Sequence, residues 1–280
     1  YVLNKATSTW SSKTWTGLTN FYGNEIWTDG DDIYYSSGYV LNKATSTWTP
    51  KSWTGLTNFY GQHIWTDGEA IYYSYEGTNY VLNKATSTWS SKTWTGLTNF
   101  YGNEIWTDGD DIYYSSGYVL NKATSTWTPK SWTGLTNFSG KHIWTDGDNI
   151  YYSLNTNQYV LNKVTSTWSS KSWNGLTNFY GQQIWTDGDA IYYSFSTNQY
   201  VLNKATSTWS PKSWTGLTNF YGYDIWTDGD TIYYSFSATQ YVLPATRHNY
   251  VDDDKYNSLF GIVTKCLCNT LSARFVFGNE

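Results

Sequence analysis

Short runs of apolar and aromatic residues alternate with polar turn sequences along most of the chain. Near the start, Ile26-Trp27-Thr28 is followed by Asp29-Gly30 and then by Ile33-Tyr34-Tyr35. An Asp-Gly pair between two β-rich runs is a strong signal for a tight hairpin, because glycine tolerates a positive φ. Two further runs follow at 39–41 and 46–48, and no segment of ten or more residues shows a helical period. The pattern therefore predicts an all-β chain of short strands joined by tight turns.

This pattern recurs with a period near forty residues. The units that begin with Tyr-Val-Leu start at Tyr1, Tyr39, Tyr80, Tyr118, Tyr159 and Tyr200. A fixed period of this length is typical of propellers and solenoids, whose units share a core because none can bury one alone. Four short strands per period predict the four-stranded antiparallel blade of a β-propeller. A β-solenoid is the alternative, although its rungs are usually shorter and have little use for three indoles per unit.

Three features of the unit resemble the kelch repeat. Ile33-Tyr34 matches the Ile-Tyr of the second kelch strand, and Thr-Ser-Thr-Trp at 45–48 matches the Thr-Asn-Thr-Trp that ends the kelch motif. Gly23 stands where kelch has the glycine before its first strand. The resemblance covers the six units of residues 1–240, with departures at Ser37-Gly38, where kelch has two glycines, and at Leu41, where it has tyrosine. It implies a kelch-like propeller that offers a loop-built face to another protein.

The last stretch, residues 241–280, also opens with Tyr-Val-Leu and then diverges. Tyr250 falls where Trp10 falls in the first unit, and 262–264 and 275–278 are candidate strands. We interpret the stretch as a degenerate seventh repeat, so that residues 1–280 form a single propeller of seven blades. The alternative is chance matching in a tail that does not fold, which leaves six blades.

The frame of the repeat predicts how the ring closes. The chain begins with the third and fourth strands of a blade, between Tyr1 and Trp10. In a seven-bladed ring these N-terminal strands complete a blade with the tail. In a six-bladed ring their partners are the strands around Ile225 and Ile232. Either closure covers strand edges that would otherwise invite aggregation.

Aromatic residues make up 20% of the chain, including 18 Trp and 28 Tyr. Each of the six regular units holds three Trp at fixed offsets, such as Trp10, Trp15 and Trp27. Aromatic side chains dominate the energetics of protein cores. We therefore expect these indoles to be buried between blades.

Charge and composition argue against several classes of function. The net charge is −5 without a basic cluster, which is unfavourable for binding nucleic acids through their phosphates. No apolar run approaches the roughly 18 residues of a membrane span. The only cysteines, Cys266 and Cys268, lie in the tail, so the fold does not depend on a disulfide framework. Since no Met occurs, we expect the sequence to derive from a longer product, and we expect a soluble, monomeric propeller without a cofactor.

Near-identical units reveal the positions that differ between blades. One is the pair after the loop glycine, such as Asn24-Glu25, and the other is the connection between the second and third strands. That connection varies in length, as the spacing of the unit starts shows: they lie 38, 41, 38, 41 and 41 residues apart. In an up-and-down blade both places lie on one face, whereas the Asp29-Gly30 hairpins and the turns at 43–45 lie on the other. Function tends to reside on variable loops over a rigid scaffold, so we predict that the variable face binds a ligand.

Side chains of the variable face form the candidate binding site. The variable pairs approach the mouth of the central channel, and the connections add two candidates, so the full set is Glu25, His63, Glu104, His142, Gln183, Asp224, Tyr75 and Asn155. Carboxylates and imidazoles can hold a divalent cation or hydrogen-bond a polar ligand. A metal needs several such atoms within about 2.3 Å of one point, and opposite blades are far apart, so we predict no metal site.

Two other acid or cysteine clusters have simpler explanations. The repeated acidic run at 29–32 lacks the spacing of a calcium loop, and Asp before Gly is what the hairpin requires. Cys266 and Cys268 have no second cysteine pair and no nearby histidine, which makes a zinc site improbable.

Catalysis finds little support in the sequence. Glu25 and Glu104 are candidates for the acid/base pair of a glycosidase, but Gln183 interrupts the acidic pattern. We predict a non-catalytic scaffold that binds a protein partner. A glycan-binding propeller is the first alternative, because exposed Trp and Tyr stack on sugar rings, and a propeller glycosidase is the second.

Overall fold

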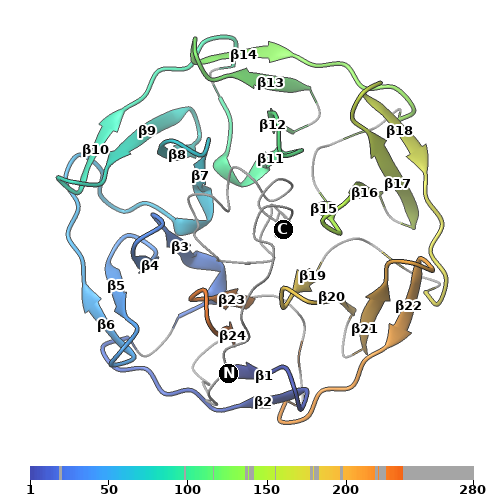
Figure 1. The fold of residues 1–280 in the computed structure, drawn as a ribbon. Helices are drawn as coiled ribbons and strands as arrows, with labels where there is room; N and C mark the ends of the chain where they lie inside the picture. The colour runs from blue at the N-terminus through green and yellow to red at the C-terminus, as the bar shows by residue number, and fades with distance from the viewer. Residues whose placement is uncertain are drawn as a thin grey trace.

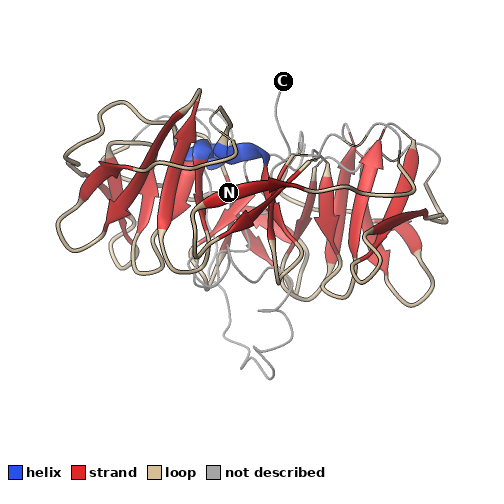
Figure 2. Ribbon diagram, turned by 90° about the horizontal axis from the view of Figure 1, so that it is seen from above, coloured by secondary structure: helices blue, strands red, loops and turns tan. Residues whose placement is uncertain are grey.

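The computed structural model describes residues 1–18, 21–97, 99–115, 117–135, 138, 142–154, 156–176, 179, 183–195, 198–217, 220 and 225–235. Strands in these residues form six four-stranded antiparallel sheets around a central axis (Figure 1). Each sheet is a blade, and the predicted all-β propeller is confirmed. Seen from the side, the blades stand next to one another in a low ring with short helical turns near one face (Figure 2).

Blades II to VI each use four consecutive strands, whereas blade I joins both ends of the described chain. Blade I contains β23 (Ile225–Thr227), β24 (Ile232–Tyr234), β1 (Val2–Asn4) and β2 (Thr9–Ser11). Blade II contains β3 (Ile26–Thr28), β4 (Ile33–Tyr35), β5 (Tyr39–Asn42) and β6 (Thr47–Pro50). Blade III contains β7 (Ile64–Thr66), β8 (Ile71–Tyr75), β9 (Thr78–Asn83) and β10 (Thr88–Ser91). Blade IV contains β11 (Ile105–Thr107), β12 (Ile112–Tyr114), β13 (Tyr118–Asn121) and β14 (Thr126–Pro129). Blade V contains β15 (Ile143–Thr145), β16 (Ile150–Leu154), β17 (Asn157–Asn162) and β18 (Thr167–Ser170). Blade VI contains β19 (Ile184–Thr186), β20 (Ile191–Phe195), β21 (Asn198–Asn203) and β22 (Thr208–Pro211). The helical turns are η1 (Gly23–Glu25), η2 (Gly61–His63) and η3 (Gly102–Glu104).

Blade I closes the ring and corrects the predicted number of blades. β1 pairs antiparallel with β24 through Val2 and Tyr233, so the N-terminal strands take the partners that a six-bladed ring requires. The seven-bladed form of the prediction therefore gives way to its six-bladed alternative, because β24 occupies the edge of β1 that a seventh repeat would need. The degenerate repeat predicted at 241–280 lies outside the described residues.

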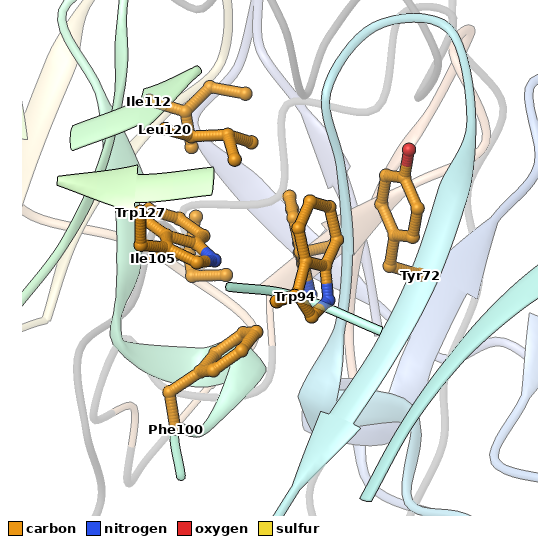
Figure 3. Packing of buried hydrophobic residues seen from close by; sticks show 8 residues of the cluster. Tyr72, Trp94, Phe100, Ile105, Ile112, Leu120 and Trp127 are labelled. Carbon is orange, nitrogen blue, oxygen red and sulfur yellow. The ribbon is translucent and has the colours of Figure 1, made fainter. Parts of the chain in front are cut away.

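Aromatic side chains fill the spaces between blades. All 18 Trp belong to the described residues, and each is buried or half-buried. Between blades III and IV, Trp127 packs on Trp94 and Phe100 with ring centroids 6.1 and 5.5 Å away (Figure 3). The ring of Trp65 also lies 6.1 Å from Trp127. Ile105 completes this cluster from the first strand of blade IV. The prediction that the indoles are buried between blades is confirmed.

Each linker between blades also pairs with the outermost strand of the blade that it enters. Thr54 forms a parallel bridge with Thr88, and the amide of Trp89 donates a hydrogen bond to the carbonyl of Thr54 at 2.8 Å. The ammonium group of Lys51 donates to Ser87 Oγ at 2.8 Å and lies 4.9 Å from the ring centre of Trp53. Equivalent parallel bridges join all six neighbouring pairs of blades, including one from Thr215 to Thr9. The repeat thus produces one type of interface six times.

The Asp-Gly hairpins explain the repeated acidic residues. Asp29 is buried, and its Oδ1 accepts hydrogen bonds from the backbone amides of Asp31 and Asp32 at 3.0 and 2.9 Å. Its Oδ2 accepts the hydroxyl hydrogen bond of Tyr34 at 3.0 Å. Burial, together with this carboxylate, raises the pKa of Tyr34. The carboxylate therefore belongs to the turn and its neighbouring strand, as the hairpin interpretation predicts.

Lysines in the turn between the third and fourth strands hold each blade to the preceding one. Lys84 Nζ of blade III donates to the carbonyl of Asp29 in blade II at 2.7 Å and lies 2.5 Å from the Asp31 carboxylate. The lysines with the equivalent carbonyl bond are Lys5, Lys43, Lys84, Lys122, Lys163 and Lys204. These contacts make the less variable face a closed belt of hydrogen bonds, which we call the lysine belt.

Candidate functional site

The two variable places of a blade lie side by side, as predicted. In blade II the amide of Ser36, at the end of the second strand, donates to the carbonyl of Glu25 at 2.9 Å. In blade V the amide of Ser153 donates to the carbonyl of His142 at 3.1 Å. Because the strands of a blade run up and down, both places lie opposite the lysine belt. Together they form the variable face of the ring.

Three helical turns form a continuous part of this face in blades II to IV. η1 contacts η2, and η2 contacts η3. Glycine makes this packing possible, since a Cβ atom at Gly61 would lie only 2.2 Å from the carbonyl oxygen of Glu25. The turns lie at the inner ends of their blades (Figure 1). We call this part of the face the mouth arc, which comprises residues 21–26, 35–38, 59–64, 73–79 and 100–105.

His63 and Tyr75 are the two predicted site residues that the structure packs together. Their ring centres lie 4.7 Å apart, and the ring of Tyr101 lies 6.1 Å from His63 and 5.6 Å from Tyr75. Only 5% of the surface of His63 is exposed. Burial lowers the pKa of His63 to about 4, against a smaller opposing effect of the Asn103 side chain. The imidazole is therefore neutral at physiological pH and surrounded by tyrosine.

Glu25 and Glu104 occupy equivalent positions on either side of His63. Burial and the nearby Glu25 carboxylate raise the pKa of Tyr35 to about 12. Burial and Glu104 likewise raise the pKa of Tyr114. Glu25 lies in blade II and Glu104 in blade IV, with η2 of blade III between them. The two carboxylates therefore belong to separate local environments rather than to one facing pair.

The remaining predicted site residues lie in other blades. His142 and Gln183 precede the first strands of blades V and VI, and both have left-handed backbones with φ of 61° and 57°. Both are half-buried. Asp224 and Asn155 lie outside the described residues. Among the described residues, no three His, Cys, Asp or Glu side chains come close enough together to hold a metal ion.

Sequence comparison between units missed the exposed tyrosines that precede the loop glycines. Tyr22 and Tyr60 are 44% and 49% exposed, and Tyr101 is half-buried at the equivalent position of blade IV. The prediction used the positions that differ most between units, whereas tyrosine recurs at this position in five of the six units, with Ser139 in the other. A conserved aromatic residue beside a loop glycine was the available signal, but the abundance of buried aromatics hid it.

Protonation of His63 should destabilise the fold in acid. In the unfolded chain His63 is protonated near pH 6.5, whereas in the folded chain it is protonated only near pH 4. The contribution of His63 to the free energy of unfolding is therefore fully present above pH 6.5 and is lost as the pH falls from 6.5 to 4. With allowance for solvent screening, we expect a loss of about 2 kcal/mol from this residue. Urea unfolding across this pH range should show a steeper decline for the parent protein than for His63→Gln. Parallel curves for the two proteins would contradict the prediction.

Comparison with known proteins identifies a fold and no family. No family model and no curated protein matches the chain. Among solved structures, it resembles the extracellular domain of a protein described as a one component system of B. thetaiotaomicron, with a TM-score of 0.50 and 11% identity. The match covers 86% of this chain and 35% of that one. It also resembles PorZ, an essential bacterial surface component of the type-IX secretion system of Porphyromonas gingivalis, with a TM-score of 0.44, 13% identity, and coverage of 76% and 30%.

These likenesses concern the propeller architecture alone, because the identities are low. This chain spans about a third of the length of the first matched structure. In the described part of the chain, no helix is long and apolar enough to cross a membrane.

Proposed function

We propose that this chain is a non-catalytic, kelch-like propeller scaffold that binds a partner protein through its variable face. The supporting observation is where the large exposed apolar side chains lie. Among the described residues they are Tyr22, Tyr60, Val164 and Phe195. Tyr22 and Tyr60 precede η1 and η2, and Phe195 ends the second strand of blade VI, so three of the four belong to the variable face.

Exposed aromatic side chains on one face of the ring favour protein binding for a physical reason. Isolated apolar residues are normal on a protein surface, but a group of them that includes tyrosine is typical of interaction sites. Tyrosine offers a large contact area with little loss of conformational freedom on binding. The opposite face is less suited to this role, because its lysines and hairpin carbonyls are already bonded to one another in the lysine belt.

Glycan binding is the second candidate. Tyr22 and Tyr60 are exposed at equivalent positions of adjacent blades, and repeated aromatic platforms suit a multivalent sugar. The glycosidase alternative receives less support, since η2 separates Glu25 from Glu104.

Site-specific photo-crosslinking tests the proposed face. A photoreactive amino acid placed at position 22 or 60 should crosslink the same protein from an extract of the source cells. The matched control carries the same group at Thr86, an exposed residue in a hairpin on the lysine-belt side. Equal crosslinking from all three positions, or crosslinking from position 86 alone, would contradict the proposal. Selective sugar binding on a glycan array without any protein crosslink would favour the lectin alternative.

A further inference from the structure

We propose that Asn174 is a site of spontaneous chemical modification, where loss of the side-chain amide converts the linker between blades V and VI to isoaspartate or aspartate. The inference is independent of the proposed function. It is carried by the residue that follows Asn174, by the surroundings of its side chain, and by the close packing of the linker on blade VI.

The linker before blade VI differs from its five equivalents at one position. A threonine followed by glycine stands there in the other linkers, at Thr16, Thr54, Thr95, Thr133 and Thr215. The linker before blade VI has Asn174-Gly175 instead, which is the only Asn-Gly pair in the chain. Because glycine has no Cβ atom, its amide nitrogen can approach the asparagine side chain without steric hindrance. Asparagine is also among the thermally labile residues of proteins.

The surroundings of Asn174 leave its side chain open to reaction. In the linker before blade III, Thr54 Oγ1 is hydrogen-bonded to Thr88 Oγ1 at 2.9 Å. The Asn174 side chain has no hydrogen bond to any described residue, and neither does the amide of Gly175. Both residues are exposed. The two groups that must combine are therefore adjacent, unbonded and in contact with water.

The reaction forms and then opens a five-membered ring. The amide nitrogen of Gly175 attacks Cγ of Asn174, the bond from Cγ to Nδ2 breaks, and Nδ2 leaves as ammonia with the proton that the Gly175 nitrogen gives up. Water then opens the cyclic imide at one of its two carbonyl groups, which yields aspartate or isoaspartate. Neither step needs an oxidant or a reductant. Since the attacking nitrogen must lose its proton, the rate should rise with pH.

Isoaspartate would disturb the interface between blades V and VI. The amide of Trp209 donates to the main-chain carbonyl of Asn174 at 2.9 Å. Gly175 has a φ of +82° and lies so close to blade VI that a Cβ atom would be 1.9 Å from the carbonyl oxygen of Trp209. Isoaspartate adds one carbon to the main chain between these two contacts and turns the bonded carbonyl into a carboxylate. The linker cannot keep both contacts in their present geometry.

Incubation of the folded protein at mildly alkaline pH, followed by peptide mapping, tests the modification. The peptide with Asn174 should gain the mass difference between NH2 and OH, and enzymatic methylation should detect isoaspartate in it. The comparison residues are Asn42 and Asn83, exposed asparagines whose side chains accept backbone hydrogen bonds in their turns. Earlier modification of either one would overturn the proposal. So would a rate at Asn174 below about a tenth of that in urea, because the native linker would then protect it.

Two variants test the role of the linker. Asn174→Thr restores the residue of the other linkers and should abolish the modification there. Thr54→Asn creates an equivalent Asn-Gly pair before blade III and should produce isoaspartate at that position. An unreactive Asn-Gly pair in Thr54→Asn would contradict the argument from linker geometry.

Hydrogen exchange of the aged protein tests the effect on the ring. Exchange at the Trp209 amide should become faster in the modified protein, whereas the Trp89 amide, which makes the equivalent bond to Thr54 at 2.8 Å, should stay protected. Aged Asn174→Thr should retain protection at both amides. Unchanged exchange at Trp209 in the modified protein would overturn the inferred disturbance of the interface.

Discussion

Replacement of Trp27 by Ala is expected to lower the free energy of unfolding by about 3–5 kcal/mol. The indole is only 5% exposed and stacks on Tyr34 with ring centres 4.4 Å apart. It also contacts Trp53 and Trp89 at 5.5 and 6.1 Å, and its Nε1 donates a hydrogen bond to the carbonyl of Ser36 at 2.9 Å. The substitution removes these contacts and leaves a cavity between blades II and III. Thermal and urea unfolding measure the loss.

The size of this loss matters because a whole domain is usually stable by only about 5–15 kcal/mol. In a closed ring, a weakened interface also affects every other blade, since no blade is independently stable. Tyr60→Ala provides the matched control, because it also removes an aromatic ring, but one that is 49% exposed. It should cost less than about 1 kcal/mol. Unchanged melting of Trp27→Ala would show that the indole is not wedged between blades.

Replacement of Gly55 by Ala is expected to destabilise the protein by about 2–4 kcal/mol. Gly55 has a φ of +80°, which is unfavourable for a residue with a side chain, and a Cβ atom there would lie 1.9 Å from the carbonyl oxygen of Trp89. The linker would have to move away from blade III, which breaks the bond between the Trp89 amide and the Thr54 carbonyl. Chemical unfolding gives the magnitude, and faster hydrogen exchange at the Trp89 amide would report the broken bond.

Gly38→Ala is the control for this substitution. A Cβ atom at Gly38 meets no other atom within 4 Å, and its φ lies outside the left-handed region. We expect its stability to stay within about 0.5 kcal/mol of the parent protein. Similar losses in Gly38→Ala and Gly55→Ala would contradict the prediction, because a Cβ atom at Gly38 makes no close contact with the next blade.

The candidate site shows where comparison between units succeeds and where it fails. Topology alone placed Glu25 next to the connection after the second strand, because the start and the end of adjacent antiparallel strands must meet. The same comparison selected His63 and Tyr75 separately, from two different variable places. It did not anticipate that they pack together, nor that Tyr60 and Tyr101 lie around them. Those contacts form where η2 and η3 meet across the interface between blades III and IV.

The sequence by itself determined the local structure of this protein and the repeated use of its aromatic residues. Apolar runs separated by Asp29-Gly30 and its copies specify strands and hairpins because their signals are local, and forty-residue units without separate cores must stack. The tertiary structure alone decided that the ring has six blades, because closure depends on the pairing of Val2 with Tyr233, which are distant in the sequence. It also decided the role of the hairpin carboxylates. Asp29 Oδ1 accepts hydrogen bonds from two backbone amides of its own turn, and Oδ2 accepts one from the hydroxyl group of Tyr34 on the next strand.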